Sequence, residues 1–85
     1  MKILCNISMF ELHQQVLLVD GTEMKPVAIS NLDDLGADIA MACSKYSINE
    51  VTLTGNTKFA SALAEEICTV GATQYGMNNI NVEVI

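Results

Sequence analysis

Apolar and polar residues alternate with a period of two in the first third of the chain. In residues 3–9, Ile-Leu-Cys-Asn-Ile-Ser-Met, every second position is apolar, which predicts a β-strand with one buried face. Residues 13–20 and 24–30 predict two more strands, separated by an Asp-Gly turn. Pro26 has no backbone N–H, so we expect the third strand at a sheet edge. Short connections predict an antiparallel meander.

The apolar period then changes to that of an α-helix. Between Leu32 and Tyr46 apolar residues recur at spacings of three and four, which predicts one buried helical face. Asn31 and Asp34 resemble a capping box at its start. Gly36 lies inside this helix, and we expect it to allow a close approach to the sheet.

The last third of the chain predicts a strand, a helix and a strand. Residues 50–55 are rich in β-branched side chains, and residues 59–70 carry an apolar helical face. We expect Gly71 and Gly76 to bracket the end of this helix. Residues 80–85, Ile-Asn-Val-Glu-Val-Ile, alternate as a final strand.

The element order is therefore β-β-β-α-β-α-β in a single domain, residues 1–85. We expect an α/β fold with a mixed, five-stranded sheet of order 3-2-1-4-5 and helices packed on it. The strongest core positions are apolar residues on the predicted helical faces and in the fourth strand: Leu35, Ile39, Leu53, Leu63 and Ile67.

That order resembles the ribonuclease H-like superfold. The segment Val-Thr-Leu-Thr-Gly-Asn at 51–56, leading into a helix, is similar to the strand-glycine-helix element of actin-like ATPase domains. The resemblance implies a nucleotide near this element. The nuclease branch would place carboxylates in the first strand, where this chain has Asn6 and Ser8. We therefore expect no catalytic residues, no metal site and no cofactor.

Charge and cysteine content narrow the choice of partner. Four lysines and no arginine against ten carboxylates give a net charge of −6, so direct nucleic-acid binding is not expected. An acidic surface instead favours solubility, or a basic protein partner. Three widely spaced cysteines predict unpaired thiols in a reducing cytoplasm, and no apolar run predicts a membrane span.

One loop is a candidate ligand site. At the carboxyl end of a strand and the start of a helix, backbone N–H groups could hold an anion with help from a lysine. Its residues are Gly55, Asn56, Thr57 and Lys58. The alternative is an ordinary helix cap.

The candidate interface combines two apolar features. Phe10 and Leu12 are large apolar residues in a connection where polar residues are usual, and either tuck under the sheet or face a partner. Val82 lies in a last strand with only one charge and no proline or lysine, so that edge is poorly protected. These features predict self-association as a homo-oligomer.

Two functions remain open at this point. The first is a non-enzymatic protein-interaction or oligomerisation module, of the small acidic kind found as phage or mobile-element accessory proteins and inhibitors. The second is a ribonuclease H-like, metal-dependent nuclease or nucleotide hydrolase that acts as an oligomer.

Overall fold

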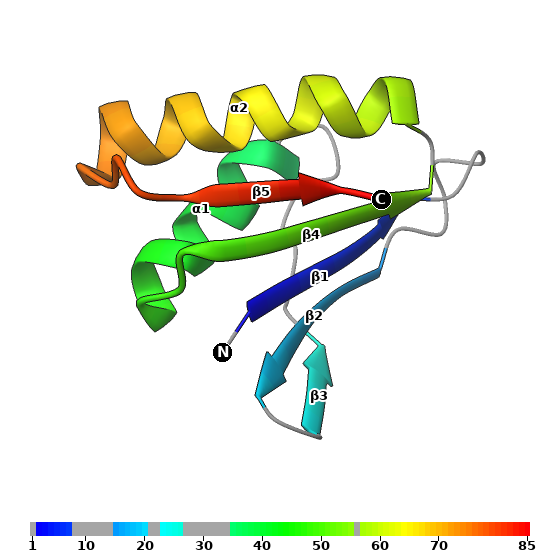
Figure 1. The fold of residues 1–85 in the computed structure, drawn as a ribbon. Coiled ribbons are helices and arrows are strands. Elements are labelled where there is room, and N and C mark those ends of the chain that lie inside the picture. The colour runs from blue at the N-terminus through cyan, green and yellow to red at the C-terminus, as the bar shows by residue number, and fades with distance from the viewer. Residues whose placement is uncertain (1, 8–14, 21–22, 27–34, 56) are drawn as a thin grey trace.

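The described part of the chain forms one mixed sheet with two helices (Figure 1). The computed structural model describes residues 2–7, 15–20, 23–26, 35–55 and 57–85. Within these residues the elements are β1 (Lys2–Ile7), β2 (Gln15–Asp20), β3 (Glu23–Pro26), α1 (Leu35–Tyr46), β4 (Glu50–Gly55), α2 (Thr57–Tyr75) and β5 (Asn81–Val84).

The strands lie side by side in the order β3-β2-β1-β4-β5. β1 pairs with β4 in parallel, with Ile3 opposite Val51, and β4 pairs with β5 in parallel, with Val51 opposite Val82. β2 pairs antiparallel with both β1 and β3. Pro26 belongs to β3, an end strand, so its predicted edge position is confirmed.

A single apolar core joins the two helices to one face of the parallel strands. The five core positions expected from the sequence are all buried. Alternate residues of β1 and β4 face the helices; these are Ile3, Cys5, Val51 and Leu53. Ile80 and Val82 are half-buried and pack against the same core from the β5 side. The helices therefore cover one face only.

The strand order is the one expected, but the fold class expected from the sequence is wrong and is corrected here. Although β2 and β3 extend the sheet, the described core side chains come from β1, β4 and the helices, with β5 against them; the side chains of β2 and β3 are outside the described ones. The β2–β3 hairpin projects away from the helices (Figure 1). The compact unit is a sheet of three parallel strands with two helices, not a ribonuclease H-like, five-stranded sheet covered by helices. The order of elements does not determine which strands the helices cover.

The end of α1 is fixed by backbone hydrogen bonds. Ser47 has a positive φ of 55°, the N–H of Ile48 donates to the carbonyl of Cys43 at 2.8 Å, and the N–H of Ser47 approaches the carbonyl of Ser44 at 3.4 Å. This is the Schellman pattern, in which a left-handed residue after the helix satisfies its last carbonyls. Ile48 is buried, so the turn also closes the core.

Helix α2 is longer than the sequence predicts. It continues through Gly71 to Tyr75, and Gly76 ends it with a φ of 66°. Gly71 is buried under Ile80, whose Cδ1 atom would lie 2.4 Å from a Cβ added at position 71. The buried face therefore extends past Val70, because Gly71 makes room for the segment that leads into β5.

Several sequence predictions fall outside the described residues. The Asp-Gly turn between β2 and β3 and the proposed capping box at 31–34 belong to this group. The same holds for the ends of the predicted strands at 8–9, 13–14 and 27–30.

Candidate functional site

Over β1, β4 and β5, the face of the sheet opposite the helices carries mostly polar side chains, with Leu4 among them. Asn6, Glu50 and Glu83 project from it and are exposed, and Thr52 and Thr54 are half-exposed. The hydroxyl of Thr54 donates to Oδ1 of Asn6 at 3.2 Å, a cross-strand bond between β4 and β1. Asn6 thus has a structural partner on this face.

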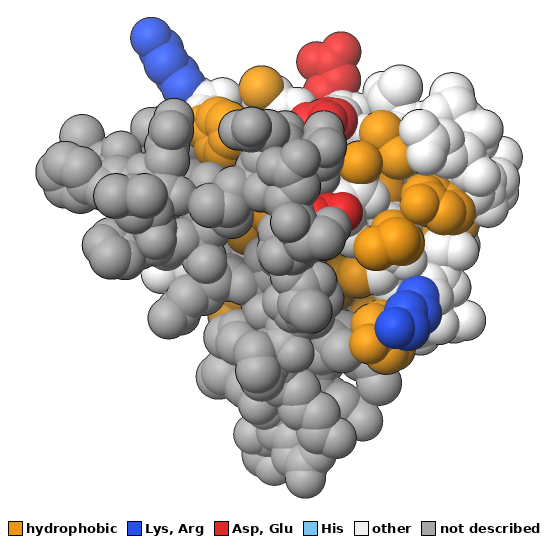
Figure 2. Space-filling model, turned by 180° about the vertical axis from the view of Figure 1, so that it is seen from behind, with side chains coloured by type: hydrophobic (Ala, Val, Ile, Leu, Met, Phe, Trp, Pro, Cys, Tyr) orange, Lys and Arg blue, Asp and Glu red, His pale blue; other side chains and the backbone are white. Residues whose placement is uncertain are grey.

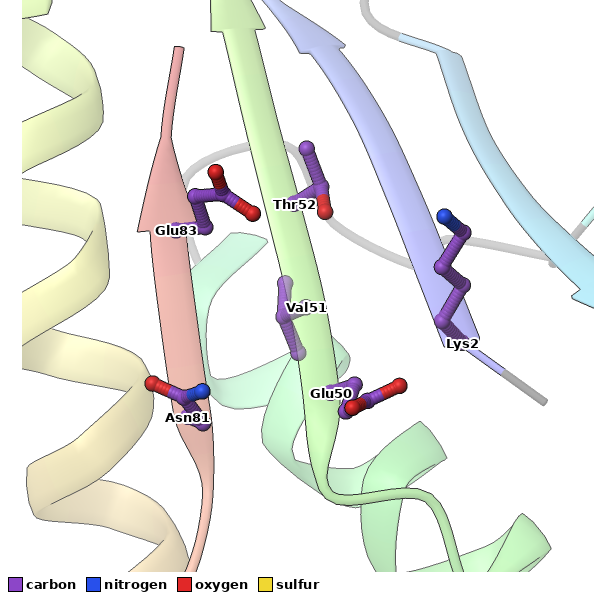
Figure 3. Close-up of a pocket in the computed structure, with 6 residues that line it drawn as sticks. All are labelled: Lys2, Glu50, Val51, Thr52, Asn81 and Glu83. Atoms are coloured by element: carbon purple, nitrogen blue, oxygen red, sulfur yellow. The ribbon is translucent and has the colours of Figure 1, made fainter.

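A shallow hollow of about 180 Å³ lies on this face. Figure 3 shows side chains from three neighbouring strands around it. Its lining residues are Lys2, Glu50, Val51, Thr52, Asn81 and Glu83. The carboxylates of Glu50 and Glu83 belong to different strands, and Thr52 lies opposite Glu83 in the register. The hollow therefore offers one positive group, two negative groups and neutral hydrogen-bonding groups on an open surface.

The hollow gives no sign of metal chemistry. Among the described residues, no group of three or more histidine, cysteine or carboxylate side chains is placed to hold a metal ion. A carboxylate pair with one lysine on an exposed surface also lacks the enclosure that strengthens charge–charge interactions. The hollow therefore offers exposed polar contacts.

The predicted anion-binding loop spans the end of β4 and the start of α2. Gly55 ends β4 with a φ of 109°, and Lys58 is exposed in the first turn of α2. Thr57 begins α2, and Asn56 lies outside the described residues. The positive φ explains the glycine, since other side chains rarely adopt that conformation. A backbone requirement therefore accounts for Gly55 without a ligand.

The predicted interface residues are placed differently from one another. Phe10 and Leu12 lie outside the described residues. Val82 is half-buried and packs against the core, so its side chain faces the helices. The exposed apolar side chains at this edge are the next two apolar positions: Val84 is 36% exposed and Ile85 is 67% exposed.

The backbone of β5 forms hydrogen bonds along one edge, toward β4, and has no described strand along its other edge. The N–H of Asn81 donates to the carbonyl of Asn49 at 2.7 Å, and the N–H of Ile85 donates to the carbonyl of Leu53 at 2.9 Å. Successive residues of a strand direct their backbone groups to opposite edges. The N–H groups of Val82 and Val84 therefore point away from β4. No described strand pairs with that edge.

Two of the three thiols are buried in the core. Burial raises the pKa of Cys5 to about 11 and that of Cys43 to about 11. Such thiols stay protonated near neutral pH, and the thiolate is the nucleophilic form. Cys68 is exposed on α2, and its Sγ lies 3.7 Å from the carbonyl oxygen of Ile80. The buried pair is therefore core packing rather than a reactive centre.

Large apolar side chains are also exposed on the helices. Figure 2 shows apolar side chains between polar ones over the described part of the helical side. They are Met41 and Tyr46 of α1 and Phe59 and Tyr75 of α2. The ammonium group of Lys45 lies 5.4 Å from the ring centroid of Tyr46 and covers part of that ring. Neither helix in the described part of the chain has the length and hydropathy needed to cross a bilayer.

Searches against protein-family models, curated proteins and solved structures give no match to this chain. The resemblance to ribonuclease H-like and actin-like domains therefore has no support. The edge of β5 was expected from the sequence as part of the interface, whereas the polar hollow was missed as a site, because it depends on strand register. The signal that was available is the alternation in residues 80–85, which separates Asn81 and Glu83 from the valines.

Proposed function

We propose that this protein is a non-enzymatic interaction module that binds protein by strand addition to the open edge of β5. The observation that carries the proposal is the direction of the Val82 and Val84 amides, away from β4. An unpaired edge offers a row of backbone donors and acceptors to an incoming strand. Main-chain hydrogen bonds then supply affinity for an extended segment.

The two edges of the sheet differ in their protection. The outer strand β3 contains Lys25 and Pro26, a charge and a residue without an N–H, which are common means of blocking strand addition. β5 contains one charge, Glu83, and neither proline nor lysine. The exposed side chains of Val84 and Ile85 add apolar surface at the same edge. The β5 edge is therefore the better binding surface of the two.

We also propose that the protein works in a reducing compartment, the cytoplasm, which is the compartment expected from the sequence. All three cysteines are unpaired, and cytoplasmic proteins keep their thiols reduced. The net charge of −6 supports a partner that is not itself strongly acidic, or association at moderate salt.

The test is a selection of displayed, extended random peptides on protein that is immobilised sparsely, as single copies. Binders should lose at least tenfold in affinity for Val84→Pro, because proline removes an N–H that points away from β4 and leaves the donors to β4 in place. Val84→Ala is the matched control, since it trims the side chain and keeps the N–H. Binders that are indifferent to Val84→Pro, or a selection without binders, would overturn the proposal.

A further inference from the structure

We propose that the strand added to β5 is the β5 strand of a second copy, paired antiparallel about a two-fold axis perpendicular to the sheet. This inference rests on the proposed function, because it needs the same open edge. It goes further in naming the partner, the direction of the strand and the register.

The outward amides restrict the register. In an antiparallel pair, the residues that exchange hydrogen bonds are those whose backbone groups face the partner, which here are Val82 and Val84. Two registers place both residues in hydrogen-bonded pairs with the second copy. In the first, Val82 lies opposite Val84 of the second copy. In the second, Val82 lies opposite Val82 of the second copy. A pairing centred on Val84 would engage only the end of β5.

Charge separates the two arrangements. With Val82 opposite Val84, Glu83 faces Glu83 of the second copy across a pair with Cα atoms about 4.5 Å apart, and like charges directly opposite are destabilising. With Val82 opposite itself, Glu83 faces Asn81 instead, and this happens twice by symmetry. The amide of Asn81 can donate to the carboxylate of Glu83. The structure therefore favours the register centred on Val82.

The same register matches the two faces of the sheet. Asn81 and Glu83 both line the polar hollow on the open face (Figure 3). On the helical face, Val82 meets Val82 of the second copy, and Val84 meets Ile80, which is half-buried against the core. Polar groups thus join polar groups, and apolar groups join apolar groups. A self-complementary edge of this kind closes as a dimer rather than growing into a fibre.

Helix α2 runs beside this edge and would lie near its counterpart in the second copy (Figures 1 and 3). In the dimer, both α2 helices lie on the same face of the joined sheet, and the two β5 strands are about 4.8 Å apart. The flank of α2 nearest the start of β5 carries small residues: Cys68 contacts the carbonyl of Ile80, and Ala72 lies beside it. Small side chains on that flank allow the two helices to approach each other.

The experiment measures the molar mass in solution and tests the register by disulfide cross-linking. Light scattering on the parent should give twice the chain mass, and Val84→Pro should return it to one chain mass. In a Cys68→Ser background, Asn81→Cys and Glu83→Cys are purified separately and mixed in a glutathione redox buffer. In the proposed register, positions 81 and 83 form a non-hydrogen-bonded pair, which suits disulfide geometry. The mixture should cross-link at least tenfold more than either variant alone.

The outcomes distinguish this inference from the proposed function. A parent that stays monomeric at every concentration overturns the second-copy inference, while edge-dependent peptide binding would still support the proposed function. Cross-linking of Glu83→Cys with itself would show the other register and overturn the one proposed here. A dimer that persists in Val84→Pro would place the interface elsewhere and overturn the inference.

Discussion

The carboxylate of Glu66 lies where a side chain at Gly36 would be. A Cβ added at Gly36 would lie 2.6 Å from the carboxylate carbon of Glu66. The glycine in α1 therefore allows a close approach to α2, not to the sheet as the sequence suggested. It also brings a negative charge to the first turn of α1, where the helix dipole favours it.

The first prediction concerns this pair. Gly36→Ala alone should change the free energy of unfolding little, because the helical gain of about 1 kcal/mol is offset by displacement of the Glu66 carboxylate. In a Glu66→Ala background the same substitution should stabilise by about 1 kcal/mol. Urea unfolding of the four proteins measures the difference. Equal effects in both backgrounds would show that the two side chains do not interfere.

Ser47 should be replaceable by glycine with a gain in stability. Its φ of 55° is a conformation that costs a residue with a Cβ roughly 1 kcal/mol or more. Ser47→Gly should therefore stabilise by about 0.5–1 kcal/mol, after allowing for the greater freedom of glycine in the unfolded chain. Ser44→Gly, inside α1, is the control and should destabilise. Thermal unfolding that ranks the two variants the other way would contradict the Schellman assignment.

Leu53 should be the most sensitive core position in β4. Its side chain is fully buried between the helices and the sheet, so Leu53→Ala should cost about 2–5 kcal/mol. The control is Thr52→Ala, one residue away on the open face, which should cost less than about 1 kcal/mol. The denaturant midpoints of the two variants are compared. Similar midpoints would show that Leu53 is not a core position.

Alkaline pH should destabilise the protein through its buried thiols. The pKa of Cys5 and that of Cys43 rise from 9.0 to about 11 on folding, chiefly because burial disfavours the thiolate. The unfolded chain then loses protons before the folded one does. Stability from this source is complete below pH 9 and is lost between pH 9 and about 11. Urea titrations at several pH values should show a shallower decline in Cys5→Ala.

Salt should strengthen the dimer inferred above. Each copy carries a net charge of −6, so two copies repel at low ionic strength. The Debye length, over which charges interact, falls from about 30 Å at about 0.01 M salt to about 8 Å at about 0.15 M salt. Sedimentation equilibrium should therefore give tighter association at the higher salt. Weaker association at higher salt would point to an interface held by opposite charges.

The elements and the core were predictable because their signals are local. A period of two identified β1, β-branched residues identified β4, and a period near 3.6 identified α1; the burial of Leu53 and Ile67 followed from those patterns. The layering was not predictable in the same way. Which strands the helices cover depends on contacts between distant segments, such as the α1 and α2 packing that Gly36 and Glu66 reveal.

The candidate sites show the same division. Gly55 was expected in a ligand-binding loop, and its positive φ gives a separate, backbone reason for the glycine. The hollow needs the register that places Thr52 opposite Glu83, which no single strand encodes, whereas the β5 edge was expected because the last strand has no proline or lysine. A register shift of one residue would exchange the polar and apolar faces of β5.

The three thiols lie at different depths, so their rates of labelling report which parts of the fold open first. Cys5 belongs to the sheet layer and Cys43 to the helix layer, both buried, whereas Cys68 is exposed on the surface of α2. A thiol reagent should modify Cys68 at once, and each buried thiol only when its own layer opens. Equal labelling rates at Cys5 and Cys43 would mean that the layers separate in one cooperative event. Faster labelling at Cys43 would mean that α1 opens locally while Cys5 stays covered.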